Sequence, residues 1–313
     1  MQMSDRIGRR MKLQDLHVLL SVVQTGSMVK AAKLLNSAQP AISRSIADLE
    51  QALGVRLLDR KRHGVEPTEY GRVLLDCGVA AFDELRQGVK NVEFLADPTA
   101  GEIRIGCNTL LAASFVSAVV DRLSRHHPRM VFHLVTDQGE RLHRELSERN
   151  VELLIVRKYG PIADAKLEFE FLYEDSYVIV ADKKNPWVRR RRIALADLVG
   201  EPWVLRSSDT TMGAVVMEAF RVSGLDHPRV SVVTNSPEVR MSLLATGRFL
   251  TIVPTSTLRS LAKHSNIKVV PVELPIARVP NGIVTLKNRT LSPVARLFIE
   301  AAREVAKPLA NRK

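Results

Sequence analysis

The chain has 313 residues, of which 45% are hydrophobic, and carries a formal net charge of +12 at pH 7. Its length suits two or three domains, each with enough apolar material for a core. The basic excess favours a negatively charged partner, either a nucleic acid or an anionic ligand. No apolar run has the length of a membrane span or the pattern of a secretory signal, and Cys77 and Cys107 fit neither a disulfide framework nor a metal site. We therefore expect a cytoplasmic protein.

The first predicted helix covers residues 13–25, where apolar side chains recur at helical spacing: Leu16, Leu19, Leu20 and Val23. Gly26 interrupts this pattern. Ser27 is placed to cap a second, short helix that carries Ala31 and Ala32 on its apolar face. We expect the first helix to pack beneath the two helices that follow it.

A third helix is predicted after a turn at Asn36 and Ser37, with Ser37 as its cap. Pro40 fits its first turn, because the backbone N–H that proline lacks has no partner there. One face is apolar: Ile42, Ile46, Leu49 and Leu53. The opposite face is polar: Gln39, Ser43, Arg44 and Asp48. Two short helices joined by a small-residue turn, the second with polar side chains at its start, are typical of a helix-turn-helix that reads the major groove.

A basic hairpin is predicted next, since residues 59–64 read Asp-Arg-Lys-Arg-His-Gly. Gly54 ends the third helix, and Leu57 and Leu58 return to the core. A basic hairpin directly after a recognition helix is typical of a wing that lies on phosphates or in the minor groove. The two helices alone could equally form a packing unit with solvated polar side chains, but the wing favours DNA binding. Thr68 then caps another helix.

A resemblance to a known family rests on five segments: Ala31-Ala32, residues 37–43, Ile46-x-x-Leu49-Glu50, Leu53-Gly54-Val55-x-Leu57-Leu58-x-Arg60 and Thr68-Glu69-x-Gly71. They look like the winged helix-turn-helix of LysR-type transcriptional regulators. Leu58, where an aromatic is usual, and Pro67 depart from the family pattern. The resemblance implies DNA contacts from six residues: Gln39, Pro40, Ser43, Arg44, Arg60 and Arg62. Ser27, Lys30 and Ser37 are further candidate contacts.

One long helix is predicted from Thr68 to about Ala96. Its apolar residues recur at roughly heptad spacing: Val73, Leu74, Cys77, Ala81, Leu85, Val89, Val92 and Leu95. This pattern fits an ordinary amphipathic core helix, but the length and the charged flanks favour pairing with a second copy. The family resemblance likewise implies a dimerising linker helix, and tetramers built as dimers of dimers. Residues 97–101 end the helix at a domain boundary.

Beyond Gly101 predicted strands and helices alternate, and Val151–Val156 is a nearly continuous apolar run, as in a buried parallel strand. We therefore expect a mostly parallel α/β sheet. The arrangement resembles the family's effector-binding domain, two α/β lobes similar to periplasmic binding proteins. The predicted fold class is thus α+β multidomain. Its predicted parts are a winged domain (1–67), a linker helix (68–98) and an effector domain (99–313), with lobe I at about 101–173 and 271–313 and lobe II at about 174–270.

Ligands in open α/β sheets bind beyond the carboxyl ends of strands, where helix N-termini offer free N–H groups. This rule selects eight candidates: Asn108, Thr109, Thr136, Gln138, Arg157, Ser207, Ser208 and Thr210. Such residues also cap helices without any ligand. Arg157 could pair a carboxylate or another anion, or form an interdomain ion pair. A sugar, a carboxylic acid and an aromatic acid all fit these side chains.

The predicted function is a ligand-responsive regulator of transcription that binds an interrupted palindrome in promoter DNA and contacts RNA polymerase if it is an activator. One alternative is a solute-binding module with N-terminal docking helices, against which the basic wing argues. The other is an enzyme. The sequence has no nucleophile elbow, phosphate-binding loop, dinucleotide-binding turn or metal-ligand spacing, so we predict no catalytic residue, metal or cofactor.

Overall fold

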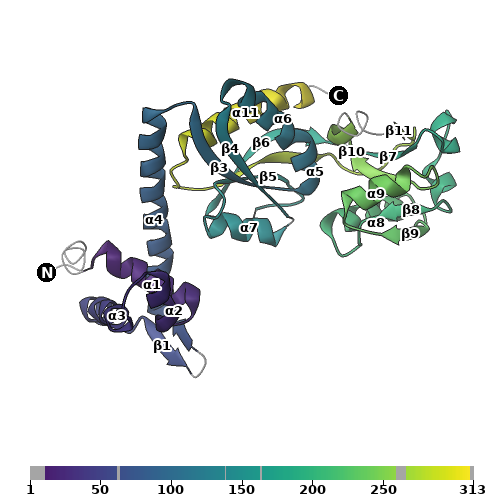
Figure 1. Cartoon of the computed structure of the whole chain (residues 1–313). Coiled ribbons are helices and arrows are strands. Elements are labelled where there is room, and N and C mark those ends of the chain that lie inside the picture. Colours follow the sequence, from purple (N-terminus) through teal and green to yellow (C-terminus); the bar gives the residue numbers. More distant parts are fainter. Residues whose placement is uncertain (1–10, 62–63, 138, 163, 259–265, 311–313) are drawn as a thin grey trace. The chain divides into compact units, whose positions relative to one another are not determined.

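The computed structural model of the chain describes residues 11–61, 64–137, 139–162, 164–258 and 266–310. It contains two compact units, Met1–Val89 and Lys90–Lys313, and the division falls within one long helix, α4 (Glu69–Ala96) (Figure 1). Within the described ranges, no helix combines the length and the apolar character that crossing a bilayer requires.

The first unit consists of three short helices, a hairpin and the beginning of α4. Its elements are α1 (Leu13–Thr25), α2 (Met28–Leu34), α3 (Gln39–Leu53), β1 (Leu58–Lys61) and β2 (Gly64–Pro67), the two strands pairing antiparallel. The predicted helices and hairpin are therefore confirmed. Their core is one apolar cluster that includes Leu19, Val22, Ile42, Leu49 and Leu57, all buried.

Two turns of this unit depend on glycine. Gly26 ends α1 with φ +67° and Gly54 ends α3 with φ +74°, a left-handed conformation that side chains disfavour. The predicted Ser27 cap is confirmed, since its Oγ accepts a hydrogen bond from the Lys30 N–H at 3.5 Å.

Two details of the helix predictions are wrong. The cap of α3 is Ala38, because the Ser37 N–H donates to the Ala32 carbonyl and so belongs to the turn that closes α2. In α1 the buried residues are Leu16, Val18, Leu19, Ser21 and Val22, whereas Leu20 and Val23 are only half-buried. The reason is that α1 packs against both α2 and α3, so two neighbours decide which side of the helix is covered.

The start of α4 is held tightly against the wing. The Thr68 N–H donates to the Leu57 carbonyl at 2.9 Å, and the Thr68 Oγ1 caps the helix by accepting from the Gly71 N–H at 3.0 Å. A Cβ on Gly71 would lie 2.1 Å from the Leu57 carbonyl oxygen, so only glycine allows this approach.

The second unit contains a five-stranded sheet in the order β4-β3-β5-β12-β6. The strands are β3 (Ala100–Cys107), β4 (Arg129–Thr136), β5 (Leu153–Arg157), β6 (Leu167–Asp175) and β12 (Val279–Leu286). β3 pairs parallel with β4 and β5, but β12 runs antiparallel to both of its neighbours. The prediction of a mostly parallel sheet is therefore wrong, because a strand from far along the chain returns through the middle of the sheet.

Helices cover both faces of this sheet (Figure 1). α6 (Ser117–His126) and α11 (Pro293–Ala310) pack on one face, and α7 (Glu140–Ser147) packs on the other. α6 is preceded by a helical turn, α5 (Thr109–Leu111), and a π-helical segment, Ala112–Val116. The helix predicted from Ala113 thus begins at Thr109, directly after β3.

The chain then builds a second, smaller lobe. It contains β7 (Tyr177–Asp182), β8 (Trp203–Leu205), α8 (Thr211–Val222), β9 (Val230–Val233), α9 (Pro237–Leu244), β10 (Thr251–Pro254) and β11 (Ile267–Val269). The sheet order is β10-β7-β11 with antiparallel pairing, while β8 and β9 pair parallel. Trp203 is fully buried and meets Phe220 edge-on at 5.6 Å between ring centres.

The chain leaves the larger sheet at Asp175, enters the smaller one at Tyr177, and returns between Val269 and Val279. Asp175 is buried at the first crossing. Its carboxylate accepts hydrogen bonds from Thr255 Oγ1 (2.7 Å), Ser256 N (3.0 Å) and Ser256 Oγ (2.5 Å). Because Thr255 and Ser256 follow β10, these bonds join the crossing to the second lobe.

We expect Gly71→Ala to loosen the first unit, because its methyl group would overlap the Leu57 carbonyl. The expected cost is about 1–3 kcal/mol of local stability. Hydrogen–deuterium exchange of peptides from residues 13–67 measures it. The control is Arg72→Ala, an exposed neighbour in the same helix. Equal protection in the two variants would contradict the close approach.

We expect Asp175→Ala to lower the free energy of unfolding of the second lobe by about 3 kcal/mol, because three donors and a nearby arginine lose their acceptor. Urea unfolding followed by tryptophan fluorescence reports on this lobe, since both tryptophans, Trp187 and Trp203, lie in its core. Glu174→Ala, an exposed neighbouring carboxylate, should change the value by less than about 0.5 kcal/mol.

Candidate functional site

The first turn of α3 presents polar side chains away from the core. Gln39, Pro40 and Arg44 are exposed, while Ile42 and Ile46 on the other side of the helix are buried. Ser43 is half-buried, and its Oγ lies 3.3 Å from the Met28 Sδ. Ser43 therefore contacts α2 as well as solvent. The fully exposed side chains near the start of α3 are those of Gln39, Pro40 and Arg44.

The remaining candidates for DNA contact lie around this helix. Ser27 is engaged as the cap of α2, Lys30 is exposed on α2, and Ser37 is exposed in the turn before α3. Arg60 belongs to β1, opposite Val65 of β2, but its side chain lies outside the described part, as does all of Arg62. The neighbouring Lys61 pairs with Glu66 across the hairpin.

The backbone of the wing is fixed by a carboxylate from α3. Glu50 Oε1 accepts hydrogen bonds from the N–H groups of Leu57 (2.7 Å) and Leu58 (3.3 Å). The Val65 N–H donates to the Gly26 carbonyl at 3.0 Å, which ties the second wing strand to the end of α1. The wing and the recognition helix are thus held as one body by hydrogen bonds.

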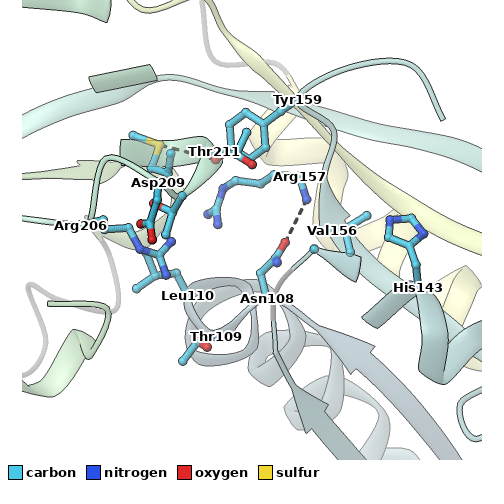
Figure 2. Close-up of a pocket in the computed structure, with 13 residues that line it drawn as sticks. Asn108, Thr109, Leu110, His143, Val156, Arg157, Tyr159, Arg206, Asp209 and Thr211 are labelled. Atoms are coloured by element: carbon cyan, nitrogen blue, oxygen red, sulfur yellow. Dashed lines mark hydrogen bonds between the residues drawn. The ribbon is translucent and has the colours of Figure 1, made fainter. Parts of the chain in front are cut away.

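The second unit contains a cavity of about 300 Å³ between its two lobes (Figure 2). Segments that follow β3, β5 and β8, together with the start of α8, form its walls. Its lining residues are Asn108, Thr109, Leu110, Gly139, His143, Val156, Arg157, Tyr159, Arg206, Asp209, Thr210, Thr211 and Met212.

Asn108 connects the strand ends on the first lobe. Its Oδ1 accepts a hydrogen bond from the Arg157 N–H at 3.1 Å, drawn as a dashed line in Figure 2, and its Nδ2 donates to the Asp137 carbonyl at 3.5 Å. Its own N–H donates to the Ile155 carbonyl at 3.3 Å. The side chain that follows β3 therefore sets the position of Arg157 at the end of β5.

Arg157 is a buried cation of the cavity, with 5% of its side chain exposed. Its guanidinium extends into the cavity toward the segment that carries Arg206 and Asp209 (Figure 2). Two of its buried nitrogens, Nε and Nη2, have no hydrogen-bond partner in the described part of the chain. Its ion pair with Asp175 is long, at 3.9 Å.

The second lobe adds further positive charge. Arg206 directly follows β8, and its buried Nε has no hydrogen-bond partner among the described residues. Burial lowers the pKa of Arg206, and the positive charge of Arg157 lowers it further. Behind Arg206, burial and the Arg206 charge lower the pKa of Arg240 to about 10. The cavity is thus lined by two guanidinium groups, those of Arg157 and Arg206, together with one carboxylate, that of Asp209.

Tyr159 lines the cavity and contacts a second tyrosine, Tyr177. The hydroxyls of Tyr159 and Tyr177 are 2.7 Å apart, and the Tyr159 hydroxyl lies 3.5 Å from the Met212 Sδ. Burial raises the pKa of Tyr177 above its ordinary value. The hydroxyl of Tyr159 is thus a hydrogen-bonding group of the cavity wall, held by Tyr177.

The cavity brings together half of the residues that strand-end reasoning selected. Asn108, Thr109, Arg157 and Thr210 line it, whereas Thr136, Ser207 and Ser208 do not, and Gln138 lies outside the described residues. Thr210 caps α8 by accepting from the Gly213 N–H at 3.1 Å. Arg206 was missed although it occupies the first position after β8, where the same rule applies. Tyr159 and Met212 have no signal of this kind in the sequence.

The arrangement of the described residues includes no group of three or more His, Cys, Asp or Glu side chains able to hold a metal ion. Cys107 is buried, and burial raises the pKa of its thiol to about 11, while Cys77 is exposed on α4. The cavity itself is lined by arginine, hydroxyl and amide groups, with Asp209 as a carboxylate.

Comparison with known proteins matches two parts of the chain to two family models. Residues 13–72 match the model "Bacterial regulatory helix-turn-helix protein, lysR family", and residues 96–307 match the model "LysR substrate binding domain". Among curated relatives, the HTH-type transcriptional regulator GbpR of Azospirillum brasilense is 25% identical over 94% of this chain and 86% of its own length. TdcA of Escherichia coli (strain K12) is 26% identical over 94% and 93%.

Solved structures share the fold over nearly the full length. A full-length OxyR variant from Pseudomonas aeruginosa has a TM-score of 0.68 at 19% identity and covers 97% of this chain and 99% of its own. Full-length CbnR complexed with its target DNA has a TM-score of 0.55 at 21% identity and covers 95% and 100%. The helix-turn-helix, the two-lobed domain with its cavity and both family matches lead to one conclusion: the chain belongs to the LysR family of ligand-responsive, DNA-binding transcriptional regulators.

Proposed function

We propose that the first turn of α3 reads base edges in the major groove of promoter DNA through Gln39, Pro40 and Arg44, with Ser43 beside them. The observation that carries this proposal is the exposed polar start of α3 above a closed apolar core. Glutamine and arginine suit adenine and guanine edges, respectively. A helix-turn-helix of this kind docks by the N-terminal residues of its second helix.

The wing and α2 supply the contacts that position the protein on the duplex. In this proposal Arg60 and Arg62, the arginines of the predicted wing, neutralise phosphates or enter the minor groove, and Ser27, Lys30 and Ser37 contact the DNA backbone. Such contacts add affinity that depends on salt and carries little sequence information. Because its partner is promoter DNA, we place the protein in the cytoplasm, with RNA polymerase as a further partner if it activates transcription.

Two copies pair through α4 in this proposal. The helix exposes a row of apolar side chains: Val73, Leu85, Val89, Val92 and Leu95, each at least half exposed. A single chain gains nothing from this row, whereas a second copy would bury it. Paired winged domains then match the two halves of an interrupted palindrome, and two dimers form a tetramer.

The effector binds in the cavity between the lobes. Asn108, Thr109 and Arg157 come from one lobe, and Arg206 and Thr210 come from the other. A ligand that contacts both lobes favours the conformation in which they are close together, which couples the cavity to the dimer geometry. No catalytic role is assigned to any residue, in keeping with a family of regulators.

We expect Gln39→Ala and Arg44→Ala each to weaken specific DNA binding by about 1–3 kcal/mol, a loss of roughly tenfold or more in affinity. A duplex selected from a random pool by the purified protein provides the target, and fluorescence anisotropy at physiological salt measures affinity. The control is Gln51→Ala, an exposed glutamine about 18 Å along the same helix. Equal affinity of the wild type for selected and random duplexes would refute sequence-specific reading by α3.

We expect the double change Leu85→Glu and Val92→Glu to raise the dimer dissociation constant at least tenfold, because like charges replace apolar contacts along the helix pair. Sedimentation velocity over a range of concentrations measures it. The control is Asp76→Lys, an exposed residue on the side of α4 opposite Leu85. This change of charge should leave association unchanged. A double variant that associates as tightly as the wild type would show that α4 is not the pairing surface.

A further inference from the structure

We propose that the effector of this regulator is a small organic anion, whose carboxylate or phosphate group binds between Arg157 of the first lobe and Arg206 of the second. This proposal rests on the assignment of the cavity as the effector site and narrows it to one chemical class. Of the three classes that the sequence leaves open, an uncharged sugar is then excluded as the effector, and the carboxylic and aromatic acids remain.

The first argument is the state of Arg157. Its side chain is 95% buried, it lines the cavity, and two of its nitrogens have no hydrogen-bond partner in the described part of the chain. A buried charged group without partners is unfavourable, so such groups are normally paired. The guanidinium presents parallel N–H donors that match the two oxygens of a carboxylate or phosphate.

Asp175 does not supply this partner. Its Oδ2 is 3.9 Å from the Arg157 Nη2, too far for a hydrogen bond. Its two oxygens already accept three hydrogen bonds from Thr255 and Ser256. The carboxylate therefore compensates part of the Arg157 charge while leaving the donors on the cavity side free.

The charges around the cavity remain unbalanced. Arg206 lines the cavity with Arg157. Burial, and after it the charge of Arg157, lowers the pKa of Arg206, and burial, and after it the charge of Arg206, lowers the pKa of Arg240. Asp209 also lines the cavity, but it is exposed and forms no ion pair with either lining arginine among the described residues. Glu238 is exposed and accepts a hydrogen bond from Ser236. The cavity thus has room for one more negative group.

The other lining groups match an anion with an apolar body. Thr211 is the first residue of α8, which begins at the cavity, so the backbone N–H groups of this helix start and the Thr211 hydroxyl can donate to an anion. Thr109, which follows Asn108, adds a second hydroxyl. Leu110, Val156 and Met212 supply apolar surface. A cavity of about 300 Å³ lies at the small end of the range for ligand sites, so the molecule is compact.

This chemistry also explains how the ligand would act. Without an anion, Arg157 and Arg206 repel one another across the gap between the lobes. An anionic group attracts both guanidiniums. It therefore replaces a repulsive interaction between the lobes with an attractive one, and this change in free energy favours the arrangement in which the lobes are close together. Neutral ligands of equal size would not produce this change.

The test uses the full-length protein and measures melting temperature with four probes at equal ionic strength: benzoate, benzamide, glucose 6-phosphate and glucose, each against sodium chloride. Inorganic phosphate serves as a fifth probe. The proteins are the wild type, Arg206→Gln and the control Arg221→Gln, an exposed arginine of the same lobe. Variants of Arg157 are avoided because its burial makes them prone to misfolding.

We expect at least one anionic probe, or inorganic phosphate, to raise the melting temperature of the wild type and of Arg221→Gln, while the neutral partner of each organic probe does not. Arg206→Gln should lose this excess and bind the probe at least tenfold more weakly. If benzoate raises the melting temperature and the two phosphate probes do not, the site binds a carboxylate. The opposite result indicates that it binds a phosphate group. Equal stabilisation of the wild type and Arg206→Gln by every anion would overturn the proposal, since general salt effects act on both.

A further variant separates this proposal from the site assignment on which it rests. Thr211→Trp places a large side chain at an exposed position of the cavity wall. If a neutral probe binds the wild type and loses binding in Thr211→Trp, the cavity is the effector site but the anion proposal is wrong. If an anionic probe binds Thr211→Trp and Arg206→Gln as tightly as the wild type, both the site and the proposal are wrong.

Discussion

The carboxylate of Asp175 holds the effector-binding unit together at the point where the chain passes from one lobe to the other. Three hydrogen bonds from Thr255 and Ser256 fix the second lobe to this crossing, and the same carboxylate faces Arg157 at the end of β5. Buried polar groups are tolerated when their partners are in place and are costly otherwise. The attachment of the second lobe to this crossing therefore depends on a single side chain.

The cavity holds like charges close together. Arg157 and Arg206 line it, and burial together with the Arg206 charge lowers the pKa of Arg240. Asn108 fixes the backbone at Arg157 through a hydrogen bond that links the ends of β3 and β5. In the proposed mode of binding, an anion between the two lining arginines would offset this unfavourable arrangement of charge.

The strand that ends at Arg157 also reaches the last part of α4 within the second unit. β5 carries Arg157 at its last position, and Glu152, just before its first, is buried against Lys90 of α4 at 2.8 Å and the Ser292 N–H at 3.2 Å. A short strand, paired on both sides with β3 and β12, thus lies between the cavity and this end of α4.

Local sequence determined the elements of this protein. Glycines at 26 and 54, the caps at Ser27 and Thr68, Pro40 and the basic hairpin define the winged domain because each acts through its immediate neighbours. The strand-end rule likewise found Asn108, Thr109, Arg157 and Thr210. Tertiary structure alone decided the rest. β12 pairs antiparallel within the sheet. The buried face of α1 depends on its packing against both α2 and α3. Tyr159 and Met212, which come from separate lobes, contact each other at the cavity. These depend on contacts between residues far apart in the chain, about which periodicity and capping carry no information.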